Sequence, residues 1–151
     1  MAFPLPEPMR WALDAAAQAG AAGEVPVGAV ITRGGARIAT AANRMRSLGD
    51  PTAHAELEAI RAALAILGTG RLDGCDLWVT LEPCAMCAGA IAHVRLDRIY
   101  YAAPDEKGGA VAHGPRFFGQ PTCHHRPEVY AGLGEAESAA MLRAFFADRR
   151  S

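Results

Sequence analysis

The residues best suited to chemistry form two short clusters. His54 and Glu56 belong to the run Pro51–Glu56, and Cys84 and Cys87 form a Cys-x-x-Cys pair. A histidine and two thiolates are typical zinc ligands, and three protein ligands leave the fourth tetrahedral position for water. An open position of this kind distinguishes a catalytic zinc from a structural one. The two clusters therefore predict a zinc enzyme.

Glu56 is the residue expected to move protons at this centre. A catalytic zinc lowers the pKa of its water toward neutrality, and a nearby carboxylate can accept a proton from that water. Glu56 would then deliver protons to a ring nitrogen and to a leaving amine, so that the products are a carbonyl and ammonia. On an ideal helix His54 and Glu56 would not share a face, but in a first turn they can flank an ion that lies over the helix end.

Each cluster has a simpler explanation when it is considered alone. A lone Cys-x-x-Cys is a redox pair or half of a structural zinc site about as often as a catalytic ligand pair, and a lone His-Ala-Glu is usually only a helix start. Here they occur in the order H-x-E…P-C-x-x-C, each before an apolar helix. This order is the signature of the zinc nucleobase deaminases, and it favours the catalytic interpretation.

Apolar periodicity places both clusters at helix N-termini. The first helix is predicted to begin at Asp50 or Thr52, either of which can cap it, with Pro51 in its first turn. It is predicted to end at Gly68, after an i, i+3, i+4, i+7 stripe of Leu57, Ile60, Ala63, Leu64 and Leu67. Residues 84–94 predict a second, Ala/Gly-rich helix. A cysteine at a helix N-terminus has a lowered pKa, which favours the thiolate that binds metal.

The rest of the chain predicts an α/β fold. Further helices are expected at residues 9–19 and 135–150. Strands are expected at residues 25–31, 36–41, 76–81, 98–102 and 129–131, and Gly34-Gly35 predicts a tight hairpin turn between the first two. The expected architecture is a three-layer α/β/α sandwich around a mixed five-stranded sheet that starts with an antiparallel hairpin.

Length and composition restrict the class of protein to which the chain can belong. With 151 residues, 51% of them apolar and 21% charged, the chain is expected to form a single zinc-dependent deaminase domain over residues 1–151. The start lacks the features of a secretory signal, and no apolar run reaches the roughly 18 residues of a membrane span. Together with the Cys-x-x-Cys pair, this predicts a cytoplasmic protein without a membrane. Cys75 and Cys123 are expected to be buried and inert.

The formal net charge of −1 argues against broad, non-specific binding of nucleic acid. A local basic patch is still compatible with it, because residues 107–127 contain no Asp or Glu but several basic side chains. Phe117-Phe118 lie in the middle of this segment. Two interpretations stay open: the segment supplies phosphate contacts and stacking, or its phenylalanines simply anchor a long loop to the core.

The chain resembles the cytidine-deaminase-like superfamily and, within it, the family of bacterial tRNA-specific adenosine deaminases. The likeness extends over nearly the whole length. It rests on residues 24–30, 43, 50–56, 79–90 and 105–110 and on the segment from Phe145-Phe146 to Arg149-Arg150. The zinc motif alone specifies the superfamily, and the flanking stretches indicate the tRNA enzymes.

The resemblance implies hydrolytic deamination of adenosine to inosine at the wobble position of an arginine tRNA anticodon. It also implies a homodimer, one zinc ion per subunit and contact with the tRNA anticodon stem-loop. A base in an unpaired loop is the least costly to splay out toward such a site. The substrate-binding residues that the resemblance implies are Val27, Asn43, the backbone of Ala55, Asp105, Phe145 and Arg149. Without the family they would be ordinary core, turn and surface residues.

Three other functions compete with this one. A guanine deaminase that acts on the free base shares the Asp-Pro-Thr-Ala-His-Ala-Glu run. Many small cytidine deaminases bind zinc with three cysteines, whereas His54 is the first ligand here. A non-catalytic, zinc-stabilised RNA-binding module would leave Glu56 and the open coordination position without a purpose. The substrate that releases ammonia discriminates these alternatives.

Overall fold

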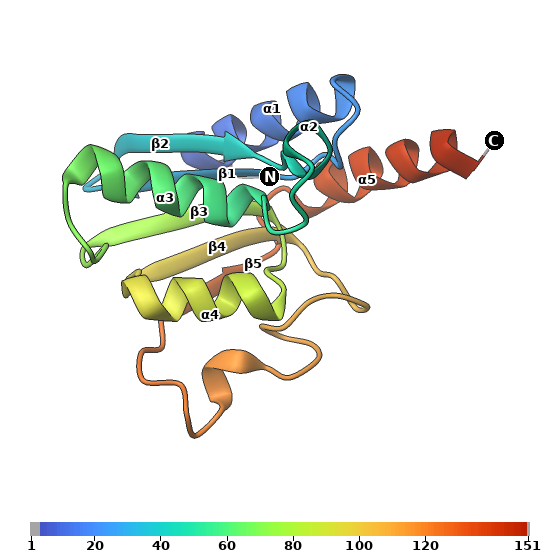
Figure 1. Ribbon diagram of the computed structural model, residues 1–151. Helices are drawn as coiled ribbons and strands as arrows, with labels where there is room; N and C mark the ends of the chain where they lie inside the picture. Colours follow the sequence, from blue (N-terminus) through green and yellow to red (C-terminus); the bar gives the residue numbers. More distant parts are fainter. Residues whose placement is uncertain (1–3, 151) are drawn as a thin grey trace.

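A mixed five-stranded sheet forms the centre of the protein (Figure 1). The computed structural model describes residues 4–150. The strands are β1 (Gly28–Arg33), β2 (Ala36–Ala42), β3 (Cys75–Leu81), β4 (Arg98–Ala103) and β5 (Glu128–Ala131), in the order β2-β1-β3-β4-β5. β1 is antiparallel to β2 and β3, whereas β4 is parallel to β3 and β5. The predicted mixed sheet with an initial hairpin is confirmed.

Helices cover both faces of the sheet. They are α1 (Glu7–Ala21), the short α2 (Met45–Leu48), α3 (Ala55–Leu67), α4 (Ala85–Val94) and α5 (Glu135–Arg150). Because successive strand residues point to opposite faces, Ile31, Leu77 and Ile99 pack in the core beneath α3 and α4, while Val30 and Trp78 pack beneath α1. The α/β/α sandwich is therefore confirmed, and Figure 1 shows its layers. Within residues 4–150, no helix is long and apolar enough to cross a membrane.

Glycines are needed at two places in the hairpin region. Gly34 and Gly35 have φ values of 56° and 82°, so both central positions of the predicted two-residue turn are left-handed, as a type I′ turn requires. Gly28 begins β1 directly beneath α1, where an added Cβ would lie 2.1 Å from the carbonyl oxygen of Ala12. In the structure β1 begins at Gly28, three residues later than the predicted residue 25.

The predicted start of the first catalytic helix is wrong. α3 begins at Ala55, and His54 occupies its N-cap position without a side-chain capping bond. The Asp50 carboxylate instead accepts hydrogen bonds from the backbone N–H and the hydroxyl of Thr52, at 2.8 and 2.7 Å. These bonds close a turn before the helix. As a result the His54 ring does not cap the helix and can face the cysteines.

The segment between β4 and β5 is the long non-periodic stretch that the sequence predicts. It contains one short 3-10 helix, η1 (Phe117–Gly119), and lies outside the helix layer in Figure 1. Phe118 is buried in the core cluster beside α4, and Phe117 is half-buried. For Phe118, the interpretation that it anchors the loop to the core is confirmed. The polar loop before Asp50 also contains α2, which the sequence did not predict.

Candidate active site

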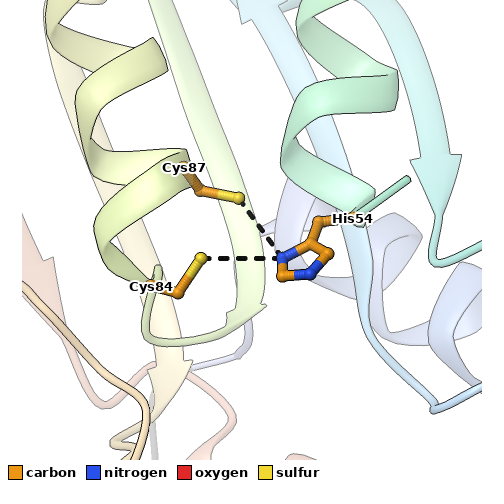
Figure 2. Close-up of side chains that lie close together, drawn as sticks. All are labelled: His54, Cys84 and Cys87. Atoms are coloured by element: carbon orange, nitrogen blue, oxygen red, sulfur yellow. Dashed lines mark hydrogen bonds between the residues drawn. The ribbon is translucent and has the colours of Figure 1, made fainter. Parts of the chain in front are cut away.

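Three metal-binding side chains converge between the N-termini of α3 and α4 (Figure 2). His54 Nδ1 lies 3.6 Å from Cys84 Sγ and 3.5 Å from Cys87 Sγ, and the ligand atoms all lie within 4.8 Å of one another. A tetrahedral zinc ion with ordinary bond lengths would hold a sulfur and a nitrogen about 3.6 Å apart. The spacing and the donor types of this group therefore fit zinc.

Hydrogen bonds within the group distribute its protons. The Cys87 thiol donates to Cys84 and lowers the pKa of Cys84 to about 4, despite its partial burial. The same bond, together with burial, raises the pKa of Cys87. The bond to Cys84 also raises the pKa of His54. Cys84 is thus a ready thiolate, whereas a metal would have to displace the proton of Cys87, so that metal binding releases a proton.

Glu56 is a buried carboxyl group beside these ligands. Only 4% of the residue is exposed, and burial raises its pKa to about 7, with the negative charge of Cys84 acting in the same direction. Its side chain also interacts with Cys87. A carboxyl group that exchanges protons near neutral pH is suited to general acid and base catalysis.

A pocket of about 260 Å³ opens over this group. It is lined by Val25, Val27, Asn43, Met45, His54, Glu56, Leu81, Glu82, Cys84, Asp105 and Gly108. This volume is at the small end of ligand sites and suits a single base better than a large ligand. A wider hollow of about 640 Å³ shares Val25, Leu81, Asp105 and Gly108 with it and reaches Phe146 on α5. The pocket therefore opens toward α5.

Four of the six predicted substrate residues lie at or beside this pocket. Val27 and Asp105 line it. Asn43 lines it as well, and its side chain bridges two parts of the backbone: Oδ1 accepts from the Ala55 N–H at 2.9 Å, and Nδ2 donates to the Val25 carbonyl at 3.3 Å. The Ala55 N–H thus has an acceptor within the protein. This bond fixes the first turn of α3, which carries Glu56.

The other two predicted substrate residues, Phe145 and Arg149, do not line the pocket. Phe145 is only 8% exposed, and the Arg149 guanidinium lies 4.0 Å from the centre of its ring. Both line a separate hollow beside α1. It is Phe146, 45% exposed, that lines the hollow next to the catalytic pocket. Phe145 and Phe146 are adjacent on one helix, so only the packing of α5 distinguishes their environments.

Sequence reasoning did not assign five residues that line the pocket, Val25, Met45, Leu81, Glu82 and Gly108, nor Phe146 in the hollow beside it. Met45 lies in the unpredicted helix α2. Glu82 directly precedes the Pro-Cys of the zinc motif. This position is the only feature of the sequence that could have suggested a role for it. The two cysteines outside the motif, Cys75 and Cys123, are both buried as expected, and burial raises the pKa of Cys75. A raised pKa keeps that thiol protonated and unreactive.

Comparison with known proteins gives a consistent result. Residues 6–103 match the cytidine and deoxycytidylate deaminase zinc-binding region. A tRNA-specific adenosine deaminase of Agrobacterium fabrum is 57% identical over 142 residues, which are 94% of this chain and 93% of the relative.

Two solved structures give the structural comparison. One comes from a study of A-to-I editing by tRNA:A34 deaminases at the wobble position of transfer RNA. It is 57% identical with a TM-score of 0.89 and covers 90% of this chain and 99% of its own. Guanine deaminase from Bacillus subtilis is more distant, at 35% identity and a TM-score of 0.66, with 99% and 96% covered. This chain therefore belongs to the zinc-binding cytidine and deoxycytidylate deaminase family and, within it, to the tRNA-specific adenosine deaminases.

Proposed function

We propose that this protein hydrolyses adenosine to inosine at the wobble position of a tRNA anticodon, an arginine tRNA in the first instance, and releases ammonia. The observation that carries the proposal is the convergence of His54, Cys84 and Cys87 with the buried Glu56 in a pocket for one base. The choice of substrate is supported by the 57% identity with a tRNA-specific adenosine deaminase, against 35% with a guanine deaminase.

The metal in this proposal is one zinc ion per subunit, held by His54, Cys84 and Cys87. Their mutual distances of 3.5 and 3.6 Å and their Cys₂His chemistry support zinc over harder cations, which prefer oxygen ligands. When bound, zinc supplies a Lewis acid that makes water a nucleophile at neutral pH.

Glu56 is the proposed catalytic acid and base. Water attacks C6 of the adenine, and Glu56 accepts a proton from that water. The carboxyl group delivers this proton to a ring nitrogen. It then accepts the second proton, from the hydroxyl group now bound to C6, and delivers it to the amino group, so that the C6–N bond breaks, ammonia leaves and a carbonyl remains. The buried position of Glu56 keeps bulk water from taking over these proton transfers.

Residues around the catalytic centre are proposed to hold the nucleoside and its neighbours. Val27 forms a wall for the base, and Asn43 orients the nucleoside while it fixes Ala55. Asp105 and Arg149 contact the neighbouring nucleotides. Phe145 is proposed to act by carrying the Arg149 guanidinium, 4.0 Å from its ring centre, and Phe146 offers the exposed ring beside the pocket.

Assembly and location are part of the same proposal. We propose one deaminase domain over residues 1–151 that acts as a cytoplasmic homodimer on the tRNA anticodon stem-loop. Ile66 on α3 and Met86 on α4 are large apolar side chains with exposed fractions of 63% and 39%, and contact with a second subunit would remove either side chain from water. An unpaired anticodon loop keeps the cost of extruding the adenosine low.

The test is deamination by the zinc-loaded protein of an arginine tRNA anticodon stem-loop with a wobble adenosine. Inosine and ammonia are expected from this RNA, and no product from free guanine, adenosine or cytidine. The matched control is the same stem-loop with its adenosine moved into a base pair of the stem, which should not react. Turnover of guanine with untouched RNA would retain the zinc chemistry but reject the tRNA substrate.

A further inference from the structure

The Glu82 carboxylate accepts hydrogen bonds from one segment of the chain, residues 105–113. Glu82 lies just after β3, and its side chain is fully buried. It accepts five hydrogen bonds, all from residues 105–113: the backbone N–H groups of Asp105, Val111, Ala112 and His113, and the imidazole Nδ1 of His113, at distances from 2.8 to 3.2 Å. Charge-assisted bonds of this kind are stronger than neutral ones.

At Gly109 the backbone of this segment approaches the Glu82 carboxylate too closely for any residue with a side chain. A Cβ at Gly109 would lie 2.5 Å from Glu82 Cδ and Oε2 and from the carbonyl oxygen of Asp105. Glycine at this position therefore allows residues 105–113 to surround the Glu82 carboxylate. Two backbone bonds complete this arrangement, from Gly109 N–H to Asp105 O and from Ala110 N–H to Pro83 O, both at 2.9 Å.

The segment that Glu82 holds is one wall of the catalytic pocket. Asp105 and Gly108 line the pocket together with Val27 and Glu56. Residues 104–113 contain no helix or strand, so no regular ladder fixes their position, and the bonds to Glu82 join this segment to the end of β3. Glu82 also precedes Cys84 by two residues, and its own N–H donates to the Ala103 carbonyl at 2.8 Å. The strand end that delivers a metal ligand therefore also sets the pocket wall.

We propose that Glu82 is a positioning residue that determines how the enzyme holds and discriminates the nucleotide next to the reacting adenosine. Glu82 acts by fixing residues 104–113 and does not take part in the chemistry. This inference rests on the proposed function, because it assigns the wall residue Asp105 to a neighbouring nucleotide. It predicts that weakening the anchor loosens substrate binding and leaves the catalytic step largely intact.

The test is the variant Glu82→Gln, compared with wild type by three measurements on the zinc-loaded protein. A neutral amide cannot replace a carboxylate that faces only donors. KM for the stem-loop is expected to rise by at least about tenfold while kcat changes by less than about threefold, the pattern of lost binding rather than lost chemistry. Discrimination between stem-loops that differ at the nucleotide beside the wobble adenosine should fall by at least about fivefold. Amide exchange of residues 104–113 should accelerate at least about tenfold.

Thr32→Val is the matched control for a general loss of stability. Its hydroxyl accepts a bond from the Trp78 indole N–H at 3.0 Å, is buried, and lies where β1 pairs with Asp76, at the other end of β3 from the pocket. This variant should lose stability yet keep the wild-type KM, discrimination and loop exchange. Gly109→Ala should reproduce the Glu82→Gln pattern. The double variant should be within about twofold of the worse single variant, because both release the same loop.

The possible outcomes separate the two proposals. Wild-type KM and wild-type loop exchange in Glu82→Gln would overturn the positioning role, as would a loss confined to kcat. If Glu82→Gln does not fold, His113→Ala removes one of the five bonds and should shift KM in the same direction by a smaller factor, and an unchanged KM would count against the proposal. If wild-type protein does not deaminate the RNA, the proposed function fails, and loop exchange in the variant alone decides whether Glu82 anchors the wall.

Discussion

The metal-binding side chains share one local arrangement. His54 and Cys84 each occupy the N-cap position of a helix, in extended backbone conformation and without a side-chain capping bond, and Cys87 follows in the first turn of α4. Side chains at such positions are free to point beyond the helix end, where the exposed N–H groups favour negative charge. This explains how the two cysteines and the carboxyl group of Glu56 can be gathered in one place, with Cys84 as a thiolate.

Glu56 is the side chain whose replacement should affect the reaction most directly. Glu56→Gln should reduce kcat by at least about a hundredfold, because proton transfer by a positioned carboxyl group contributes about that much or more. The amide has nearly the same shape, so zinc content and the midpoint of thermal unfolding should stay near their wild-type values. Single-turnover kinetics and metal analysis measure these quantities.

Glu58→Gln is the matched control for this change. Glu58 lies two residues further along the first turn of α3, and its exposed partner Arg61 is 3.8 Å away. The Glu58 side chain is half-buried, but the pair is long and Arg61 is exposed, so its loss should cost little stability and this variant should remain fully active. A Glu56→Gln protein that keeps more than about a tenth of the wild-type kcat would contradict the assignment of the catalytic acid and base.

The convergence of the three candidate metal ligands is the part of the site that the sequence predicted best. The types and spacing of His54, Cys84 and Cys87 predicted their convergence because each ligand belongs to a local motif at a helix start. The role of Glu82 could not be predicted in the same way. Its partners are more than twenty residues away in a segment without periodicity. No short sequence pattern predicts that the backbone of such a segment will donate hydrogen bonds to a distant carboxylate.

At the scale of elements, α5 shows where periodicity stops being informative. The sequence predicted the helix and placed Phe145 and Phe146 on its apolar side, yet only Phe145 is buried. The same limit applies to the start of α3, where Asp50 and Thr52 are both good caps. In the structure, Asp50 closes a turn with Thr52 instead of capping. Tertiary packing and competing local bonds decide such cases.

The two phenylalanines should therefore behave differently when truncated. Phe145→Ala should lower the free energy of unfolding by about 3–5 kcal/mol, as is typical for a buried phenylalanine, because the ring packs beneath Arg149 and beside Arg46. Phe146→Ala should change stability by less than about 1 kcal/mol but raise KM for the stem-loop severalfold, since its exposed ring lines the hollow beside the pocket. Denaturant unfolding and steady-state kinetics separate these effects. Equal stability losses would refute the distinction between them.

At the scale of the whole molecule, the sheet brings together helix starts that are distant in the sequence. α3 crosses from β2 to β3, and α4 crosses from β3 to β4 on the same face (Figure 1). Their N-termini meet where β3 ends, and Figure 2 shows His54, Cys84 and Cys87 close together there. A metal held by these three side chains would link the two helices. A metal that binds only the folded arrangement stabilises the whole protein.

Removal of the metal should therefore lower the unfolding temperature. Free zinc at a thousandfold excess over its Kd stabilises a folded protein by about 4.1 kcal/mol, and each kcal/mol corresponds to about 2–4 °C in a domain of this size. A chelator should thus lower the midpoint by roughly 8–16 °C, and added zinc should restore it.

His54→Ala and Cys87→Ala should bind less than one zinc per chain by metal analysis, and their midpoints should no longer respond to chelator. Full stoichiometry in either variant would refute the ligand assignment, because both side chains belong to the same group of three candidate ligands.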